Sequence, residues 1–239
     1  MGISTTTTSE RRLLLNLIWC LAATDAALIL LHVFTGISAI DLDQEANLTT
    51  WYSSVKLLGI AGMSAAVAAR HSAANGRGMA RLWLINAVVF LGLSADETAS
   101  LHESFARWVL DLPALEALRS TLTRGDELKA SYAWVWVFLP LILLATAFLT
   151  YLFLKSFRGQ PGLSVLFGLG LVSLLSAVVL EGLVMTFPPL VEWGVEQTDR
   201  YLLLTTFEEC GELVGSTLLM AAISIYYARA GAAGSTRSS

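Results

Sequence analysis

The chain has 239 residues, of which 55% are hydrophobic and only 14% are charged, and its mean hydropathy is +0.65. Because soluble domains carry about 25% charged residues, this composition excludes an ordinary soluble protein and indicates an integral membrane protein. The net charge of -4 and the lack of a solvated basic stripe argue against nucleic-acid binding.

Six apolar stretches are long enough to cross a bilayer, which takes about 20 helical residues. They predict an all-α, polytopic membrane protein that forms one six-transmembrane-helix bundle over residues 11–229. We expect the spans near 12–35, 51–70, 81–103, 131–155, 162–187 and 201–227. Residues 1–10 and 230–239 are rich in small and polar side chains, so they are predicted to be disordered tails.

Basic residues gather on one predicted side of the membrane. With the N-terminus inside, Glu10 is the only acid of the inner segments. The basic residues of these segments are Arg11, Arg12, Arg70, Arg77, Arg81, Lys155, Arg158, Arg229 and Arg237. The positive-inside rule therefore predicts a multi-pass protein of the bacterial inner (plasma) membrane with both termini in the cytoplasm.

The connections and the later spans differ in character. Residues 104–130 alternate charged and apolar side chains, which predicts one or two amphipathic helices at the outer interface. This segment is either a lid over the outer ends of the helices or a surface loop without a chemical role.

The span at 131–155 is uncharged up to Leu154 and is expected to face lipid, with Trp134 and Trp136 in the aromatic belt. Glycines such as Gly211 and Gly215 predict that the last two spans pack inside the bundle.

Eight ionisable side chains lie inside three of the predicted spans. They are Asp96, Glu97, His102 and Glu103 in the third span, Glu181 in the fifth, and Glu208, Glu209 and Glu212 in the sixth. A charge at the centre of a membrane helix costs roughly 3 kcal/mol or more, so these acids need a shared compensating partner. A rise of about 1.5 Å per residue places all eight in the outer half of the membrane. Asp25, His32 and Lys56 fall at comparable depth and, with Ser100, are the expected surrounding groups.

Helical spacing sorts these residues by face. On one continuous third helix, Asp96 and Glu103 would share a face, with Ser100 between them, and His102 would be offset from Glu103 by about 100°. On the sixth, Glu212 lies three residues after Glu209 and four after Glu208. Such spacing presents pairs of carboxylates to one ion or to neighbouring ions.

The acids of this cluster far outnumber its one lysine, Lys56. Two divalent cations would bring the site near neutrality, and carboxylates with imidazole are the ligands of dinuclear iron or manganese sites in helical bundles. We therefore predict a dinuclear metal site, with iron or manganese favoured and zinc possible. Two alternatives are a proton- or cation-conducting site and a structural network of protonated acids.

Three motifs resemble a group of uncharacterised bacterial six-helix membrane proteins, over most of the chain. They are Leu93-Ser94-Ala95-Asp96-Glu97, Leu101-His102-Glu103, and Phe207-Glu208-Glu209 with Glu212. The resemblance implies no established activity. Ser94, Asp96 and His102 superficially suit the alkaline-ceramidase-like hydrolases, but those enzymes need a late H-x-x-x-H pair, and this chain has no histidine after His102.

A metal site of this kind predicts a membrane oxidoreductase or hydrolase acting on a lipid or quinone-like substrate. In an oxidative mechanism His102 would ligate or tune one of two metals, and in a hydrolytic one a free glutamate would act as base toward metal-bound water. The alternative is a proton- or cation-binding transporter or channel component, although the inner halves of the spans contain almost no ionisable groups. A second alternative is a non-catalytic membrane sensor or assembly subunit. The sequence leaves the catalytic residues and the oligomeric state unknown.

Overall fold

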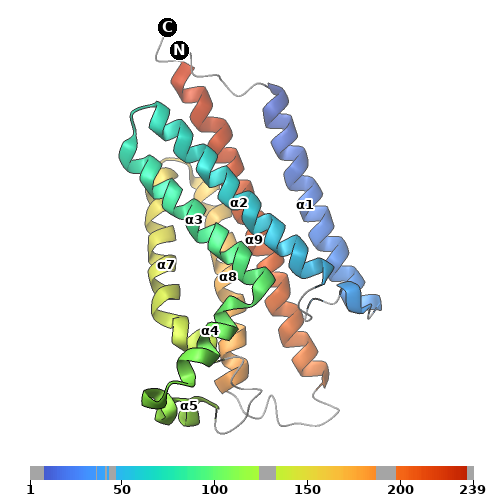
Figure 1. Ribbon diagram of the computed structural model, residues 1–239. Coiled ribbons are helices and arrows are strands. Elements are labelled where there is room, and N and C mark those ends of the chain that lie inside the picture. Colours follow the sequence, from blue (N-terminus) through green and yellow to red (C-terminus); the bar gives the residue numbers. More distant parts are fainter. Residues whose placement is uncertain are drawn as a thin grey trace.

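A computed structural model describes residues 8–35, 37–40, 42, 47–123, 133–186 and 198–235 (Figure 1). Within these ranges all regular structure is helical, which confirms the predicted fold class. Six helices are long and apolar enough to cross a membrane. They are α1 (Thr8–Thr35), α2 (Leu48–Ala73), α3 (Arg77–Ala99), α7 (Trp134–Ser156), α8 (Pro161–Thr186) and α9 (Thr198–Ser235).

Short helices complete the described chain: α4 (Leu101–Leu110) and α5 (Glu116–Thr123), with 3-10 turns at Ser38–Ile40 and Pro113–Leu115. They agree with the amphipathic helices predicted for 104–130, except that α4 begins earlier and residues 124–132 lie outside the described ranges. The predicted tails also differ, because α1 already starts at Thr8 and α9 continues to Ser235. The remaining tail residues, 1–7 and 236–239, are likewise outside the described chain.

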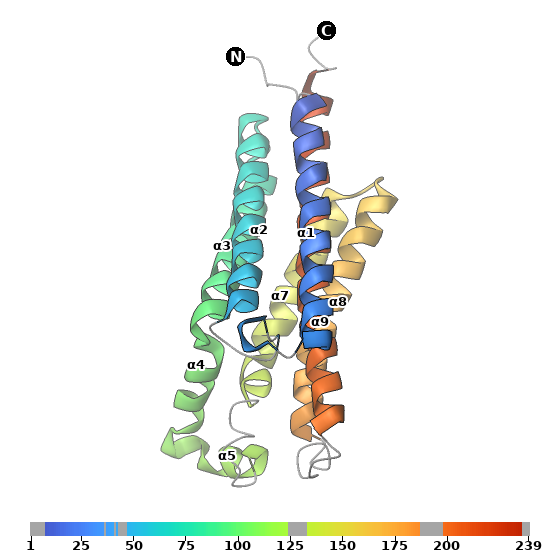
Figure 2. The same cartoon turned by 90° about the vertical axis from the view of Figure 1, so that its right-hand side faces the viewer.

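Helix α9 is the central helix of the bundle and packs against α1, α2 and α8 (Figures 1 and 2). The α8–α9 contact depends on glycine. A Cβ atom on Gly215 would lie 2.9 Å from the carbonyl oxygen of Gly170, and one on Gly211 would lie 2.9 Å from that of Ser173. These distances are too short for any side chain, so the glycines set the spacing of the two helices, as their sequence pattern predicts.

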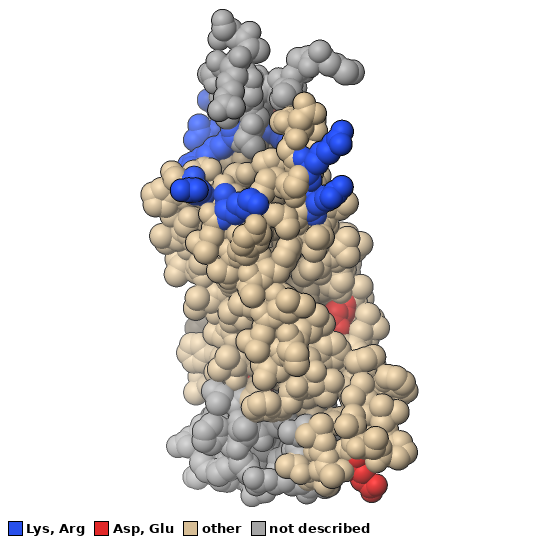
Figure 3. Space-filling model, turned by 90° about the vertical axis from the view of Figure 1, so that its left-hand side faces the viewer, with Lys and Arg blue, Asp and Glu red and all other residues tan. Residues whose placement is uncertain are grey.

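Aromatic rings fill the core near the chain termini. Trp83 of α3 lies with its ring centroid 5.5 Å from those of both Phe153 of α7 and Tyr226 of α9, and Phe153 stacks on Phe167 of α8. Lys and Arg side chains gather at this end on the face that Figure 3 shows, and α1 begins and α9 ends there (Figure 1). We call it the basic end, and the opposite end, with α4 and α5, the far end.

The third span is not one helix through residue 103. Helix α3 ends at Ala99, Ser100 adopts a left-handed conformation with φ 44° and ψ 45°, and α4 starts at Leu101 in a new direction (Figure 1). The prediction that Asp96 and Glu103 share a face of one continuous helix is therefore wrong. The break is stabilised by Asp96, whose carboxylate accepts a hydrogen bond from the His102 backbone N–H at 2.7 Å and so caps the first turn of α4.

Candidate functional site: a carboxylate and histidine cluster at the far end

The centre of the site is the side-chain contact between His102 and Asp96. Asp96 Oδ2 lies 2.8 Å from His102 Nδ1, while Asp96 Oδ1 caps α4 through the backbone, so one carboxylate fixes both the helix break and the imidazole. The His102 side chain is only 24% exposed and the Asp96 side chain 27%. The His102 ring also packs against the indole of Trp134 on α7, with 4.3 Å between centroids. The imidazole is thus held on two sides by groups from different helices.

Two further acids lie within electrostatic range of this imidazole. Glu181 of α8 accepts a hydrogen bond from the indole N–H of Trp134, the same indole that packs on His102. Glu103 lies on α4 itself, where its carboxylate is 3.6 Å from the guanidinium of Arg107. Both carboxylates act electrostatically on His102. The site therefore combines groups from α3, α4, α7 and α8.

Helix α9 contributes Glu212, which lies within electrostatic range of His102, Asp96 and Lys56. Glu97 acts on Lys56 in the same way. The structure thus brings six of the eight predicted residues into one electrostatically linked group: Asp96, Glu97, His102, Glu103, Glu181 and Glu212. Glu208 and Glu209 lie one turn earlier on α9 and are half-buried, and Glu209 acts electrostatically on the neighbouring Cys210.

The expected surrounding groups include a buried ion pair. Lys56 Nζ donates to Asp25 Oδ1 at 2.9 Å and to the Leu213 carbonyl at 2.8 Å, and both charged residues are at most 3% exposed. Thr217 donates to the other Asp25 oxygen at 2.6 Å, and the Tyr52 hydroxyl lies 2.9 Å from Oδ1. This cage joins α1, α2 and α9, and each charge has the hydrogen bonds that burial demands.

His32 and Ser100 have structural roles. His32 Nδ1 accepts from the Leu42 backbone N–H at 3.1 Å, and its Nε2 lies 3.1 Å from the Thr206 hydroxyl. This arrangement suits a neutral imidazole that donates through Nε2. His32 thereby ties the end of α1 to α9. Ser100 supplies the left-handed residue at the α3–α4 break.

The surroundings of His102 change its titration. Burial by itself lowers the pKa of His102, but the hydrogen bond and charge of Asp96, with the charges of Glu181 and Glu103, together raise that pKa above its ordinary value of 6.5. The raised pKa means that the imidazole keeps its proton to a higher pH than an ordinary histidine does. A protonated His102 would place a positive charge among the acids of four helices.

The side chains do not fit the predicted dinuclear metal site. Over the described residues, no three His, Cys, Asp or Glu side chains are grouped as a metal ion would require. Asp96 is committed to capping α4 and holding His102, and Glu181 to the Trp134 indole. Cys20 and Cys210 are both free thiols on different helices. Metal binding stays a prediction from the excess of acids.

Sequence reasoning missed three partners of the site: Trp134, Tyr52 and Thr217. Trp134 was expected in a lipid-facing aromatic belt, but it is half-buried between His102 and Glu181. Its position near the start of a span is typical of belt residues, so its sequence context carries no signal of a buried role. Thr217 lies five residues after Glu212 and four after Leu213 on one helix. This spacing is the only indication in the sequence that Thr217 faces the site.

A family model described as "Domain of unknown function (DUF8692)" matches residues 14–227. The match includes most of α1 and α9, the other four spans in full and every residue of the cluster described above. No curated protein and no solved structure matches the chain.

Proposed function

The chain belongs to the DUF8692 family, whose description states no activity, and from its own side chains we propose that it is a proton-binding component of a membrane transport system. His102 and the acids around it would take up protons, and Asp96 would pass the protonation state of His102 to the α3–α4 break. The observation that carries the proposal is the Asp96–His102 contact, in which one carboxylate both holds the imidazole and caps α4.

Protonation would change the forces among four helices. A charged His102 attracts Asp96, Glu181 and Glu103, whereas a neutral one leaves these carboxylates to repel each other within a poorly solvated site. The repulsion would act between α4 and α8, which the Trp134 indole of α7 links through its ring contact with His102 and its hydrogen bond to Glu181. Proton uptake would therefore draw the far end of the bundle together.

The proposed protons come from the outside of the cell. The Lys and Arg side chains of the basic end support a cytoplasmic location for that end under the positive-inside rule, and with it an outer location for the cluster and the α4–α5 segment. We propose the bacterial inner membrane as the location, with both termini in the cytoplasm.

Buried polar groups support a route from the cluster toward the basic end. The count of ionisable residues argues against such a route, but hydrogen-bonding groups need not be ionisable. Asn86 of α3 donates to the Ser64 hydroxyl at 2.8 Å, and both side chains are fully buried. Two turns further along α2, His71 Nε2 lies 3.0 Å from the Tyr226 hydroxyl. These two polar pairs lie at successive levels between the Asp25–Lys56 cage and the basic end, where the proposed route would pass.

Proton transport in proteoliposomes tests the proposal. The vesicles contain a pH-sensitive dye, and a potassium gradient with valinomycin drives protons inward. We expect the wild type to acidify the lumen and Asp96→Asn to lose most of this rate, since the amide cannot hold His102 and cap α4 in the same way. Asp111→Asn is the matched control, because it removes an acid from an exposed ion pair with Arg119 at the same end. Equal rates in empty and protein-containing vesicles would contradict the proposal.

Metal analysis separates this proposal from the metal-dependent enzyme predicted from charge. Mass-spectrometric elemental analysis of protein purified without chelators should find no stoichiometric iron, manganese or zinc. A stoichiometric metal that is lost in both Glu212→Gln and His102→Gln would favour the enzyme, and with it a lipid or quinone-like substrate.

A further inference from the structure

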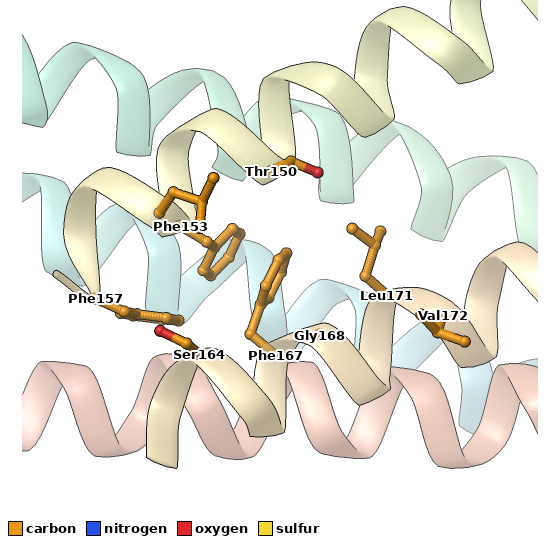
Figure 4. A pocket seen from close by; sticks show the side chains of 9 residues that line it. Thr150, Phe153, Phe157, Ser164, Phe167, Gly168, Leu171 and Val172 are labelled. Atoms are coloured by element: carbon orange, nitrogen blue, oxygen red, sulfur yellow. The ribbon is translucent and has the colours of Figure 1, made fainter. Parts of the chain in front are cut away.

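A groove of about 200 Å³ runs between α7 and α8 in the half of the bundle nearest the basic end (Figure 4). Its walls are mainly apolar, with Phe153 and Leu154 from α7, Phe157 directly after that helix, and Phe167, Leu171 and Val172 from α8. Gly168 leaves room in the wall, because a Cβ atom added there would meet nothing within 4 Å. The groove is separate from the His102 cluster, which lies at the far end.

The groove opens on the lipid-facing surface. Leu154 and Val172 at its edges are 66% and 64% exposed, and both helices are apolar enough to be membrane spans. In a bilayer this surface contacts hydrocarbon. An apolar depression here is filled by lipid chains or by another helix.

Three cations lie where the groove reaches the basic end. Lys155 is in the last turn of α7, Arg158 is exposed in the turn between α7 and α8, and Arg229 donates to Gln160 of the same turn at 3.0 Å. Within the described ranges none of the three pairs with an acid. The apolar groove therefore ends in unneutralised positive charge.

We propose that the groove binds one acyl chain of an anionic phospholipid whose phosphate headgroup lies against Lys155 and Arg158. The apolar walls suit the chain, and the cations suit a negatively charged headgroup at the membrane surface. Lys155 and Arg158 complement the negative charge of such a headgroup, whereas an apolar helix in the groove would leave them without a counter-charge. The inference is independent of proton binding by His102.

Native mass spectrometry of delipidated protein tests this binding, with phosphatidylglycerol and phosphatidylcholine added separately. We expect the wild type to retain phosphatidylglycerol preferentially, in a one-to-one complex. Gly168→Leu, which fills the groove, should weaken binding of both lipids. Lys155→Gln/Arg158→Gln should weaken phosphatidylglycerol alone by about thirtyfold, the change that corresponds to about 1 kcal/mol for each cation.

Matched controls separate the groove from general effects. Gly92→Leu makes the same change at another open, exposed glycine, and Arg11→Gln/Arg12→Gln removes two charges from the basic end on α1. Both should bind as the wild type does. Equal binding by all variants would mean nonspecific surface lipid and would overturn the proposal. A dimer that only Gly168→Leu abolishes would assign the groove to a second copy of the chain and would overturn it as well.

Discussion

At the scale of single residues, the buried ionisable groups lie in two kinds of environment. Lys56 and Asp25 neutralise each other inside a complete set of hydrogen bonds. His102 instead lies among several acids in a partly buried site at the far end. The first arrangement suits a fixed structural element, and the second suits a group that gains and loses a proton.

The titration of His102 follows from its neighbours. Because its pKa is raised in the folded protein, the stabilisation from a charged His102 is fully present below its ordinary pKa of 6.5 and is lost as pH rises through the raised value. We expect histidine NMR of labelled protein to show His102 titrating above 6.5. The chain has three histidines, so His102→Gln assigns the signal.

Asp96→Asn provides the comparison for this titration, since it removes the charge but keeps the shape. The His102 signal should then titrate at lower pH. An unchanged midpoint would show that Asp96 does not control this proton.

The Asp25–Lys56 pair makes a second prediction at this scale. Lys56→Met leaves the Asp25 carboxylate buried without its cation, so it should lower the free energy of unfolding by about 3 kcal/mol or more. The double variant Asp25→Leu/Lys56→Met removes both charges and should recover much of that loss. Denaturant unfolding in detergent micelles measures both. A double variant no more stable than Lys56→Met would show that the charges do not act as a pair.

At the scale of helices, hydropathy identifies the spans but not the break between α3 and α4. Ser100 is neither the glycine nor the proline that usually ends a helix, and the sequence from Asp96 to Glu103 predicts one continuous helix. The left-handed Ser100 is held by the Asp96 cap, a contact that only the folded chain reveals. The acids that gather could be listed from the sequence, because polar residues are rare in apolar spans. Their partners Trp134, Tyr52 and Thr217 could not, since such residues are common in membrane helices.

The α8–α9 contact is testable at this scale. Gly215→Ala puts a methyl group 2.9 Å from the Gly170 carbonyl oxygen, so the helices must separate, and we expect a loss of about 1–3 kcal/mol in stability. Thermal unfolding in micelles measures the change. Gly92→Ala is the control, since its methyl group meets nothing within 4 Å. Equal unfolding temperatures for the two variants would contradict a close-packed α8–α9 contact.

At the scale of the whole molecule, the two ends of the bundle differ in charge, and this predicts its orientation. In a background with Cys20→Ser and Cys210→Ser, a membrane-impermeant maleimide should label Ser104→Cys in intact bacterial cells. It should label Arg77→Cys only after lysis, because Arg77 starts α3 at the basic end (Figure 1). The reverse pattern would place the His102 cluster in the cytoplasm.

The packing of α1 on α9 has a consequence for how the chain is made. Synthesis delivers α1 well before α9, yet the two helices lie side by side, and Thr217 of α9 completes the hydrogen bonds of Asp25. During translation Asp25 can already meet Lys56 of α2, but the Leu213 and Thr217 groups arrive only with the final span. A chain truncated before α9 would therefore hold the Asp25–Lys56 pair in the membrane with too few hydrogen bonds.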